Sequence, residues 1–271
     1  MEKELYVNYA STAELSAELA HGKIQKEWES VSNFLPDSYF NQKWYGVESV
    51  EEAMTLLDTG DAKKAAEIKA QGEILAEKTC GRAPRIETAV VGCLPCVPNY
   101  LRGVPNAMYR VRTEHRDTPV IDIYLSLTFY DGMNTDKVAM AAAKVANVIA
   151  ATEMAGVRVN LYAVCAGRDG SKEWGFSVRL KDSDTPLNLL NVGFALCNRA
   201  FFRVCFLMWM EQRLDKYISG HGRPAKTEQI RRAYAKQPTD VVFNLMEMVE
   251  NNTPLEELED TINRAIRATA E

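Results

Sequence analysis

The sequence has few of the residues on which catalytic and metal sites usually depend. Its 271 residues include three histidines, His21, His115 and His221, which lie far apart with no pairing pattern. No glycine-rich loop follows a strand pattern, and no serine lies in a G-x-S-x-G setting, so neither a phosphate-binding loop nor a hydrolase nucleophile is predicted. The sequence therefore predicts no catalytic site, and we expect no cofactor and no bound metal.

Long apolar runs and an excess of positive charge are also lacking. The most apolar run, residues 200–210, has 11 residues and contains Arg203, which is too short to span a bilayer. The net charge of −5 predicts no general attraction to nucleic acid or to an acidic membrane, although it leaves room for a local basic patch. No basic segment followed by an apolar run opens the chain, so no secretory signal is expected. The six cysteines should then stay reduced in a cytoplasm.

Two of these cysteines, Cys93 and Cys96, have the C-x-x-C spacing of a redox pair or of half a zinc site. Zinc would need two further ligands, for which His115 is the nearest histidine. A thioredoxin-like pair would open a helix, but Pro98 and the turn residues after it argue against one. We interpret the two cysteines as small residues in a packed loop, with a redox or metal role left open.

The strongest pattern is a strand, a helix and a second strand within residues 119–168. Both strands, 120–129 and 157–165, alternate apolar and polar residues, and an unbroken helical pattern of crossover length separates them. Asn134 or Thr135 can cap the helix and Gly156 can end it. Its apolar stripe consists of Val138, Ala142, Val145, Ile149 and Thr152. The fold class is therefore α/β, a mixed sheet with a Rossmann-like βαβ core and flanking helices.

Three further segments, 85–91, 107–114 and 174–181, alternate in the same way and are predicted to join this sheet. Residues 1–34 are interpreted as helical, and a second helical region, 47–70, opens with a capping-box spacing at Ser49 and Glu52. Residues 187–218 form an apolar helical region interrupted near Asn198. We expect three parts: a helical region 1–80, an α/β core 81–218 and a helical extension 219–271.

The polar positions of these strands should gather on one face of the sheet. The candidate binding residues on this face are Arg110, Arg112, Tyr124, Arg158, Tyr162, Arg179 and Lys181, with Asp122 among them. Arginines and tyrosines together could hold phosphates and stack on bases. An antiparallel sheet with one solvated face is common, so loops, terminal helices or solvent could equally cover these residues.

Three blocks of the sequence resemble a family of uncharacterised proteins encoded by bacteriophages and other mobile elements. They are a tryptophan-glycine start to an acidic and apolar helix at residues 44–60, a proline- and glycine-rich loop at 90–108, and an apolar helix at 186–211. The last block carries an aromatic and arginine pair, Phe202 and Arg203. The resemblance implies an origin in such elements and a bacterial host cytoplasm, and no mechanism.

The strand-helix-strand unit also looks like the opening of a von Willebrand A-type domain. Those domains bind a divalent metal through Asp-x-Ser-x-Ser at the end of the first strand. Here the matching residues, 128–132, read Thr-Phe-Tyr-Asp-Gly, so the serines are missing. The resemblance therefore implies the scaffold without the ion.

We expect a non-catalytic protein that acts through protein contacts, as an adaptor, assembly or host-interfering factor. Two alternatives remain: a nucleic-acid binder that uses the tyrosine and arginine face, and a nucleotide-processing enzyme with a degenerate metal site near Asp131 and Asp169. A homo-oligomer is also considered, because the closing helix 254–268 has an apolar stripe that needs a partner surface. The candidate oligomer contacts are Leu255, Leu258, Ile262 and Ile266.

Overall fold

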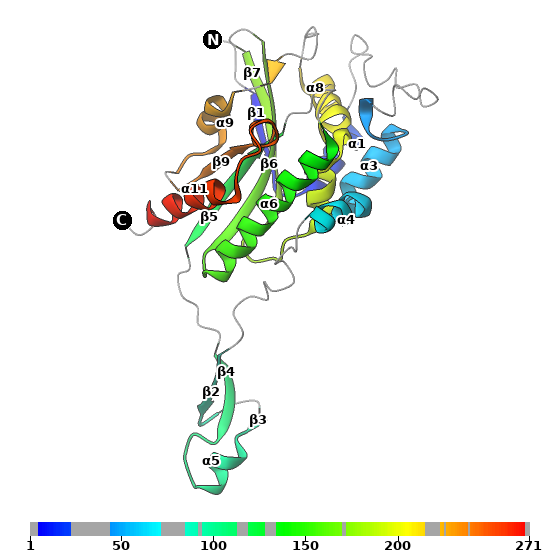
Figure 1. The fold of residues 1–271 in the computed structure, drawn as a ribbon. Coiled ribbons are helices and arrows are strands. Elements are labelled where there is room, and N and C mark those ends of the chain that lie inside the picture. Colours follow the sequence, from blue (N-terminus) through cyan, green and yellow to red (C-terminus); the bar gives the residue numbers. More distant parts are fainter. Residues whose placement is uncertain are drawn as a thin grey trace.

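The computed structural model describes residues 5–22, 44–71, 85–91, 94–112, 119–127, 134–169, 172–214, 223–224, 226–237 and 239–268. Its architecture is mixed α/β, as predicted, with helices flanking a mixed sheet (Figure 1). The strand order is β1-β7-β6-β5-β9. These strands are β1 (Leu5–Tyr9), β7 (Lys172–Lys181), β6 (Arg158–Asp169), β5 (Val120–Ser126) and β9 (Val241–Asn244), and the short β8 (Arg223–Pro224) pairs with β6.

The predicted crossover is confirmed at the centre of the sheet. Strands β5 and β6 are parallel neighbours, with Ile123 opposite Leu161. Helix α6 (Thr135–Met154) connects them, and the Asn134 side chain accepts hydrogen bonds from its first backbone amides. Gly156 follows the end of the helix at φ 91°, a left-handed conformation that glycine adopts without strain. All five residues of the predicted apolar stripe are buried, so α6 packs on one face of the sheet.

The N-terminal residues correct the helical prediction for 1–34. Residues Leu5–Tyr9 form β1, which runs parallel to β7 with Leu5 opposite Trp174. Helix α1 (Thr12–His21) starts only at Ser11, whose hydroxyl accepts from the Glu14 amide. Residues 23–34 lie outside the described part of the chain. Strands from all three predicted parts of the chain, β1, β5 and β9, thus belong to one sheet.

The predicted helix 47–70 is two helices, α3 (Val50–Thr59) and α4 (Ala62–Gln71). Half of the capping box is formed: Ser49 Oγ accepts from the Glu52 amide at 3.1 Å, whereas the Glu52 carboxylate accepts from the amide of Glu48, one residue before the N-cap. Gly60 separates the helices at φ 77°, and a Cβ there would lie 2.5 Å from the Leu190 backbone. Close packing against the 187–218 region therefore requires glycine at this break.

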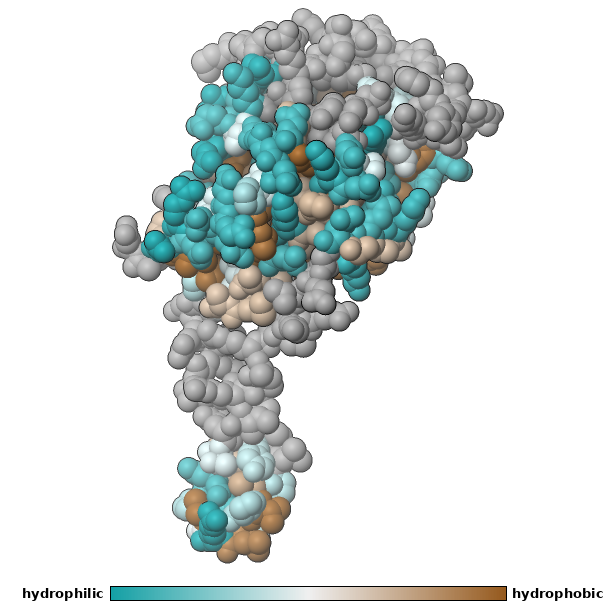
Figure 2. All heavy atoms as spheres, viewed as in Figure 1, coloured by the Kyte–Doolittle hydropathy of each residue, from teal (hydrophilic) through white to brown (hydrophobic). Residues whose placement is uncertain are grey.

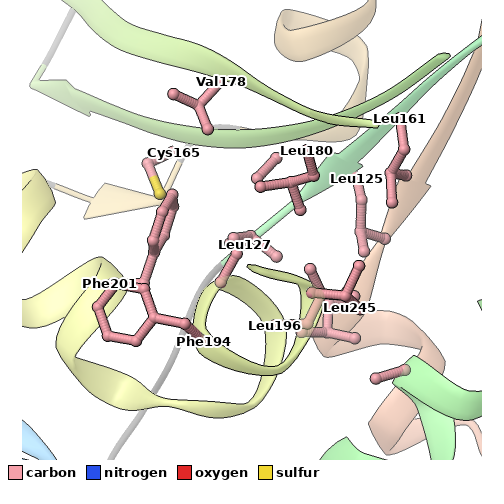
Figure 3. Packing of buried hydrophobic residues seen from close by; sticks show 14 of the residues in the cluster. Leu125, Leu127, Leu161, Cys165, Val178, Leu180, Phe194, Leu196, Phe201 and Leu245 are labelled. Carbon is pink, nitrogen blue, oxygen red and sulfur yellow. The ribbon is translucent and has the colours of Figure 1, made fainter. Parts of the chain in front are cut away.

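The apolar region after residue 186 supplies much of the core. It consists of α7 (Leu189–Val192), η2 (Gly193–Cys197), η3 (Phe201–Phe206) and α8 (Leu207–Arg213), and η2 and η3 are π-helical. The chain bends by 68° between Cys197 and Phe201, which confirms the interruption near Asn198. Figure 3 shows Phe194, Leu196 and Phe201 facing the buried side chains of the sheet.

Buried polar contacts tie this region to residues on either side of α3, Trp44 before it and Asp61 after it. The Arg203 guanidinium lies 3.6 Å from the centre of the Trp44 ring, and its Nη1 donates to the Trp44 carbonyl at 2.7 Å. Asn198 donates to the Asp61 carboxylate at 2.9 Å. The first and third blocks of the family resemblance therefore meet in the core.

In the described residues no single helix is long and apolar enough to cross a membrane. The bent pair Leu189–Cys197 and Phe201–Arg213 meets the length and composition requirement only when both helices are taken together.

Two predicted strands lie outside the main sheet. Strands β2 (Arg85–Ala89) and β4 (Met108–Arg112) pair with each other, and β4 also pairs with β3 (Leu94–Pro95), in a separate antiparallel sheet. The predicted placement of residues 85–91 and 107–114 in the main sheet is therefore wrong, because alternation identifies a strand but not its partner. We call residues 85–112 the small-sheet unit; Figure 1 shows it apart from the main sheet.

The C-terminal residues pack on both faces of the main sheet. Helix α9 (Thr227–Tyr234) contacts β5 and β9 on one face, whereas α10 (Leu245–Glu250) and α11 (Leu255–Ala268) contact α6 on the other. Strand β9 precedes α10 and was not predicted. The extension is therefore part of the main body.

Candidate functional site

The polar face of the sheet exists, but it is smaller than predicted. The strand register places Asp122 beside Asn160, Tyr124 beside Tyr162, and Tyr162 beside Arg179. The rings of Tyr124 and Tyr162 stack with centroids 4.8 Å apart and planes at 13°. Four predicted site residues, Tyr124, Arg158, Tyr162 and Arg179, therefore share this face with Asp122.

Helix α9 covers the other half of the same face. Tyr234 lies 6.1 Å from the Tyr124 ring and 5.4 Å from the Tyr6 ring. Val164, Ala166, Ile230 and Val242 complete this second apolar cluster. The open possibility that a terminal helix covers the face is thus confirmed in part, since α9 covers one half and the residues around Tyr162 stay partly exposed.

The arginines of this face are already paired with carboxylates. Arg158 Nη1 lies 2.6 Å from Asp184 Oδ1, and Arg179 Nη1 lies 2.7 Å from Asp182 Oδ2. Arg179 Nε also donates to the Ala10 carbonyl at 3.2 Å. A phosphate would have to compete with these carboxylates, which reduces the attraction of the face for nucleic acid.

The environment of this face raises the pKa of both tyrosines and so keeps them neutral. Burial raises the pKa of Tyr124, and the carboxylates of Asp122 and Asp240 raise it further. Burial followed by the Asp122 charge also raises the pKa of Tyr162. Burial and then Asp122 raise the pKa of the Asp240 carboxyl, despite amide hydrogen bonds that oppose the change. The hydroxyls therefore stay protonated and can donate hydrogen bonds, but they cannot serve as phenolate nucleophiles at neutral pH.

A buried carboxylate that sequence reasoning missed fixes α9 in place. Glu173 accepts from the Tyr6 hydroxyl at 2.7 Å, from Arg232 at 2.6 Å and from the Gln229 side chain. Burial alone would raise the pKa of Glu173, but these three hydrogen bonds outweigh it and hold the pKa below its usual value. No signal in the sequence singles out Glu173, because β7 also contains Lys172, Ser177, Arg179 and Lys181.

Three predicted face residues lie elsewhere. Leu161 pairs with Lys181 while Tyr162 pairs with Arg179, so β7 has an extra residue, Leu180, at this point. Such a bulge reverses the alternation. Lys181 consequently points to the helical side, where it is buried and its Nζ lies 2.5 Å from Glu153 Oε1. Arg110 and Arg112 belong to β4 of the small-sheet unit.

The predicted oligomer stripe is used within the chain. Helix α11 contacts α6 and β9, and Leu258 and Ile262 are buried at 2% and 1% exposure. Leu255 and Ile266 are partly buried against the same core. The stripe thus has its partner surface in its own body, and self-association through it stays an untested prediction.

The C-x-x-C motif is only half described. Cys96 is buried, and it precedes α5 (Val97–Leu101), so the prediction that no helix follows this motif is wrong. Pro98 lies in the first turn, where its missing N–H group breaks no helical hydrogen bond.

Most of the candidate metal ligands lie outside the described residues. These are Cys93, His115, His221, Asp131 with the rest of the 128–132 segment, and the side chain of Asp169. No group of three or more metal-ligating side chains occurs among the described residues.

The small-sheet unit presents a second candidate surface. Six of the nine strongly exposed large hydrophobic residues of the described chain belong to it: Val90, Val91, Val97, Tyr100, Leu101 and Val104. Figure 2 shows hydrophobic residues at several places on this unit, between hydrophilic ones, whereas hydrophilic residues dominate the main body on the same side. Among its described side chains only Cys96 is buried. Sequence reasoning treated residues 90–108 as a loop between two strands and did not separate exposed from buried apolar residues.

Comparisons with known proteins assign the chain to a family but give it no activity. No curated protein and no solved structure matches it significantly. A family model described as a domain of unknown function, DUF7192, matches residues 3–265. Because this match covers nearly the whole chain, the protein belongs to the DUF7192 family.

Proposed function

We propose that this protein acts through contacts with other proteins and without catalysis, as an adaptor, assembly or host-interfering factor. The observation that carries the proposal is the exposed apolar surface of the small-sheet unit, where Val91 and Leu101 are 77% and 78% exposed. Contiguous exposed apolar residues on a water-soluble surface are typical of interaction sites. The family resemblance adds a phage or mobile-element origin and a bacterial host cytoplasm, with the βαβ core as a von Willebrand A-like scaffold.

The small size of the unit strengthens this interpretation. It spans 28 residues, and units below about 40 residues rarely bury enough apolar surface to be stable alone. A partner that covers Tyr100 and Leu101 would supply the burial that the unit lacks. At about 25 cal/mol per Å² of apolar surface, such burial is a substantial source of binding free energy.

The proposal is tested by capture from the cells that encode the protein. The wild-type chain is compared with the variant Val91→Ser/Leu101→Ser, and Met154→Ser is the matched control, since Met154 is an exposed apolar residue of the main body at 49% exposure. We expect a protein that binds the wild type and Met154→Ser but not the double variant, and that binds again when both proteins are purified. Equal capture by all three chains would contradict the proposal.

A second candidate is nucleic-acid binding, favoured by the stacked Tyr124–Tyr162 pair. Its test is the mobility of single-stranded DNA and RNA at low salt, with Tyr162→Ala to remove stacking and Arg158→Ala/Arg179→Ala to remove positive charge. Salt-sensitive binding that both changes weaken would support it.

The enzyme alternative predicts that magnesium, manganese or a nucleotide raises the melting temperature, since a ligand at 100 times its Kd adds about 2.7 kcal/mol of stability.

A further inference from the structure

We propose that the small-sheet unit binds a second copy of this chain, on the acidic surface formed by α10 and the first half of α11. This inference rests on the proposed function and names the partner. It differs from the oligomer predicted through the α11 apolar stripe, which is buried against α6 and β9.

The charge of the small-sheet unit is opposite to that of the rest of the chain. Residues 85–112 contain four arginines, one glutamate and no lysine or aspartate, which gives a net charge of +3. The whole chain has a net charge of −5, so the remainder has −8. Arg102 is exposed and directly follows Tyr100 and Leu101, so positive charge borders the exposed apolar residues. An acidic partner with an apolar element matches this surface, and the chain itself is strongly acidic elsewhere.

The acidic surface on the main body is concentrated in one stretch of sequence. Residues 247–260 contain six carboxylates and no basic residue: Glu247, Glu250, Glu256, Glu257, Glu259 and Asp260. Five of them are exposed, and Glu259 is half-buried. The negative charge of residues 247–260 therefore complements the positive charge of the small-sheet unit.

An exposed apolar side chain lies next to this acidic stretch. Lys144 of α6 donates to the Thr253 carbonyl at 2.7 Å, in the turn between α10 and α11. Met140 lies one helical turn earlier on the same side of α6 and is 39% exposed. A side chain such as Leu101 could thus find an apolar contact within a ring of carboxylates, the arrangement of an interface with an apolar centre and a charged rim.

The contact joins two different surfaces, so it is heterologous, and successive copies would form a chain or a ring. Its charge complementarity gives it a salt dependence opposite to that of apolar aggregation. The Debye length falls from about 10 Å at 0.1 M salt to about 3 Å at 1 M, so salt should weaken this contact. Association between two apolar surfaces alone would not be weakened in this way.

The experiment is a complementation test by light scattering on the full chain. Leu101→Ser/Arg102→Glu removes the binding surface of the small-sheet unit, and Glu250→Lys/Asp260→Lys reverses the acidic surface; all four residues are exposed, so both variants should fold. We expect the wild type to associate at low salt and to become monomeric at 1 M salt. Each variant alone should be monomeric. Their mixture should give a heterodimer of twice the 30.4 kDa monomer mass, because each supplies the surface that the other lacks.

Several outcomes would overturn the inference. They are a wild type that is monomeric at every salt concentration, association that salt strengthens, and a mixture of the two variants that stays monomeric. Binding of a monomeric wild type to phosphatidylglycerol vesicles would also overturn it and assign the surface to a membrane. A monomeric chain that still captures another protein through Val91 and Leu101 would refute self-association and leave the proposed function standing.

Discussion

Replacing Glu153 tests the buried ion pair that the β7 bulge creates. The Lys181 side chain is fully buried, and its ammonium contacts Glu153 Oε1 at 2.5 Å, the Val159 carbonyl at 3.1 Å and the Asp182 carbonyl at 3.0 Å. Glu153→Gln keeps an acceptor but leaves the ammonium without a counter-charge. Breaking a fully buried pair costs about 3–5 kcal/mol. Because the Glu153 side chain is 21% exposed, we expect a smaller loss, about 2 kcal/mol of unfolding free energy.

The matched variant Lys181→Met removes the charge and keeps the packed stem. Replacement of a buried ionic group by an apolar one of similar volume is often nearly neutral, so we expect a loss of about 1 kcal/mol or less. Adding Glu153→Gln to Lys181→Met should then cost little, which makes the two changes strongly non-additive. If Lys181 instead lay on the outer face, as simple alternation predicts, it would be on the opposite side of the sheet from Glu153 of α6, and Glu153→Gln would cost little.

Urea unfolding at neutral pH measures all four proteins of this cycle. The expected loss for Glu153→Gln corresponds to a fall in Tm of about 4–8 °C for a chain of this size. Two small and additive losses would refute the reasoning, because they would show that the Lys181 ammonium is solvated and that the bulge does not bury it.

Three further changes test contacts of the core and of α9, each by urea unfolding. Tyr234→Phe should raise the unfolding free energy by about 1 kcal/mol, because the Tyr234 hydroxyl is buried with no hydrogen-bond partner in the described part of the chain; a loss would show that it is satisfied. Arg203→Lys should cost about 2 kcal/mol, since lysine cannot reproduce the planar stack on Trp44, whereas the exposed control Arg264→Lys should change little. The folded-state pKa of Glu173 lies below its unfolded value of 4.5, so its stabilising contribution is present above that pH and is lost as the pH falls through the folded pKa. Glu173→Gln should therefore lower stability at neutral pH and flatten its decline below about pH 4.5, and an unchanged acid profile would contradict this role.

The central elements could be predicted from sequence because their signals are local. Alternation identified β5, β6 and β7, and a cap at Asn134 with Gly156 after the end identified α6. The strand β1 was missed because it has only five residues and directly precedes the Ser11 cap, whose helix signal dominates the segment. The partner of a strand is a long-range property, and the local pattern of β2 and β4 therefore could not reveal their separate sheet.

The same distinction explains the errors at the candidate site. Alternation placed Tyr124, Tyr162 and Arg179 correctly on one face, because these strands are regular there. It failed for Lys181, where one extra residue in β7 reverses the pattern, and no local signal marks this bulge. The cover provided by α9 depends on Glu173, whose three partners are distant in sequence.

The pairing of β1 with β7 has a consequence for folding during synthesis. The partner of Leu5 is Trp174, so the edge of the main sheet cannot close until about 170 further residues have been added. At a synthesis rate of about 5–20 residues per second, the wait is roughly 10–30 s. Through this interval the apolar side of β1 lacks its native neighbour, and contacts of such long sequence separation form slowly. Strand β1 is thus made long before its partner β7 and joins the sheet late, and the nascent chain should depend on protection of this segment more than the finished protein does.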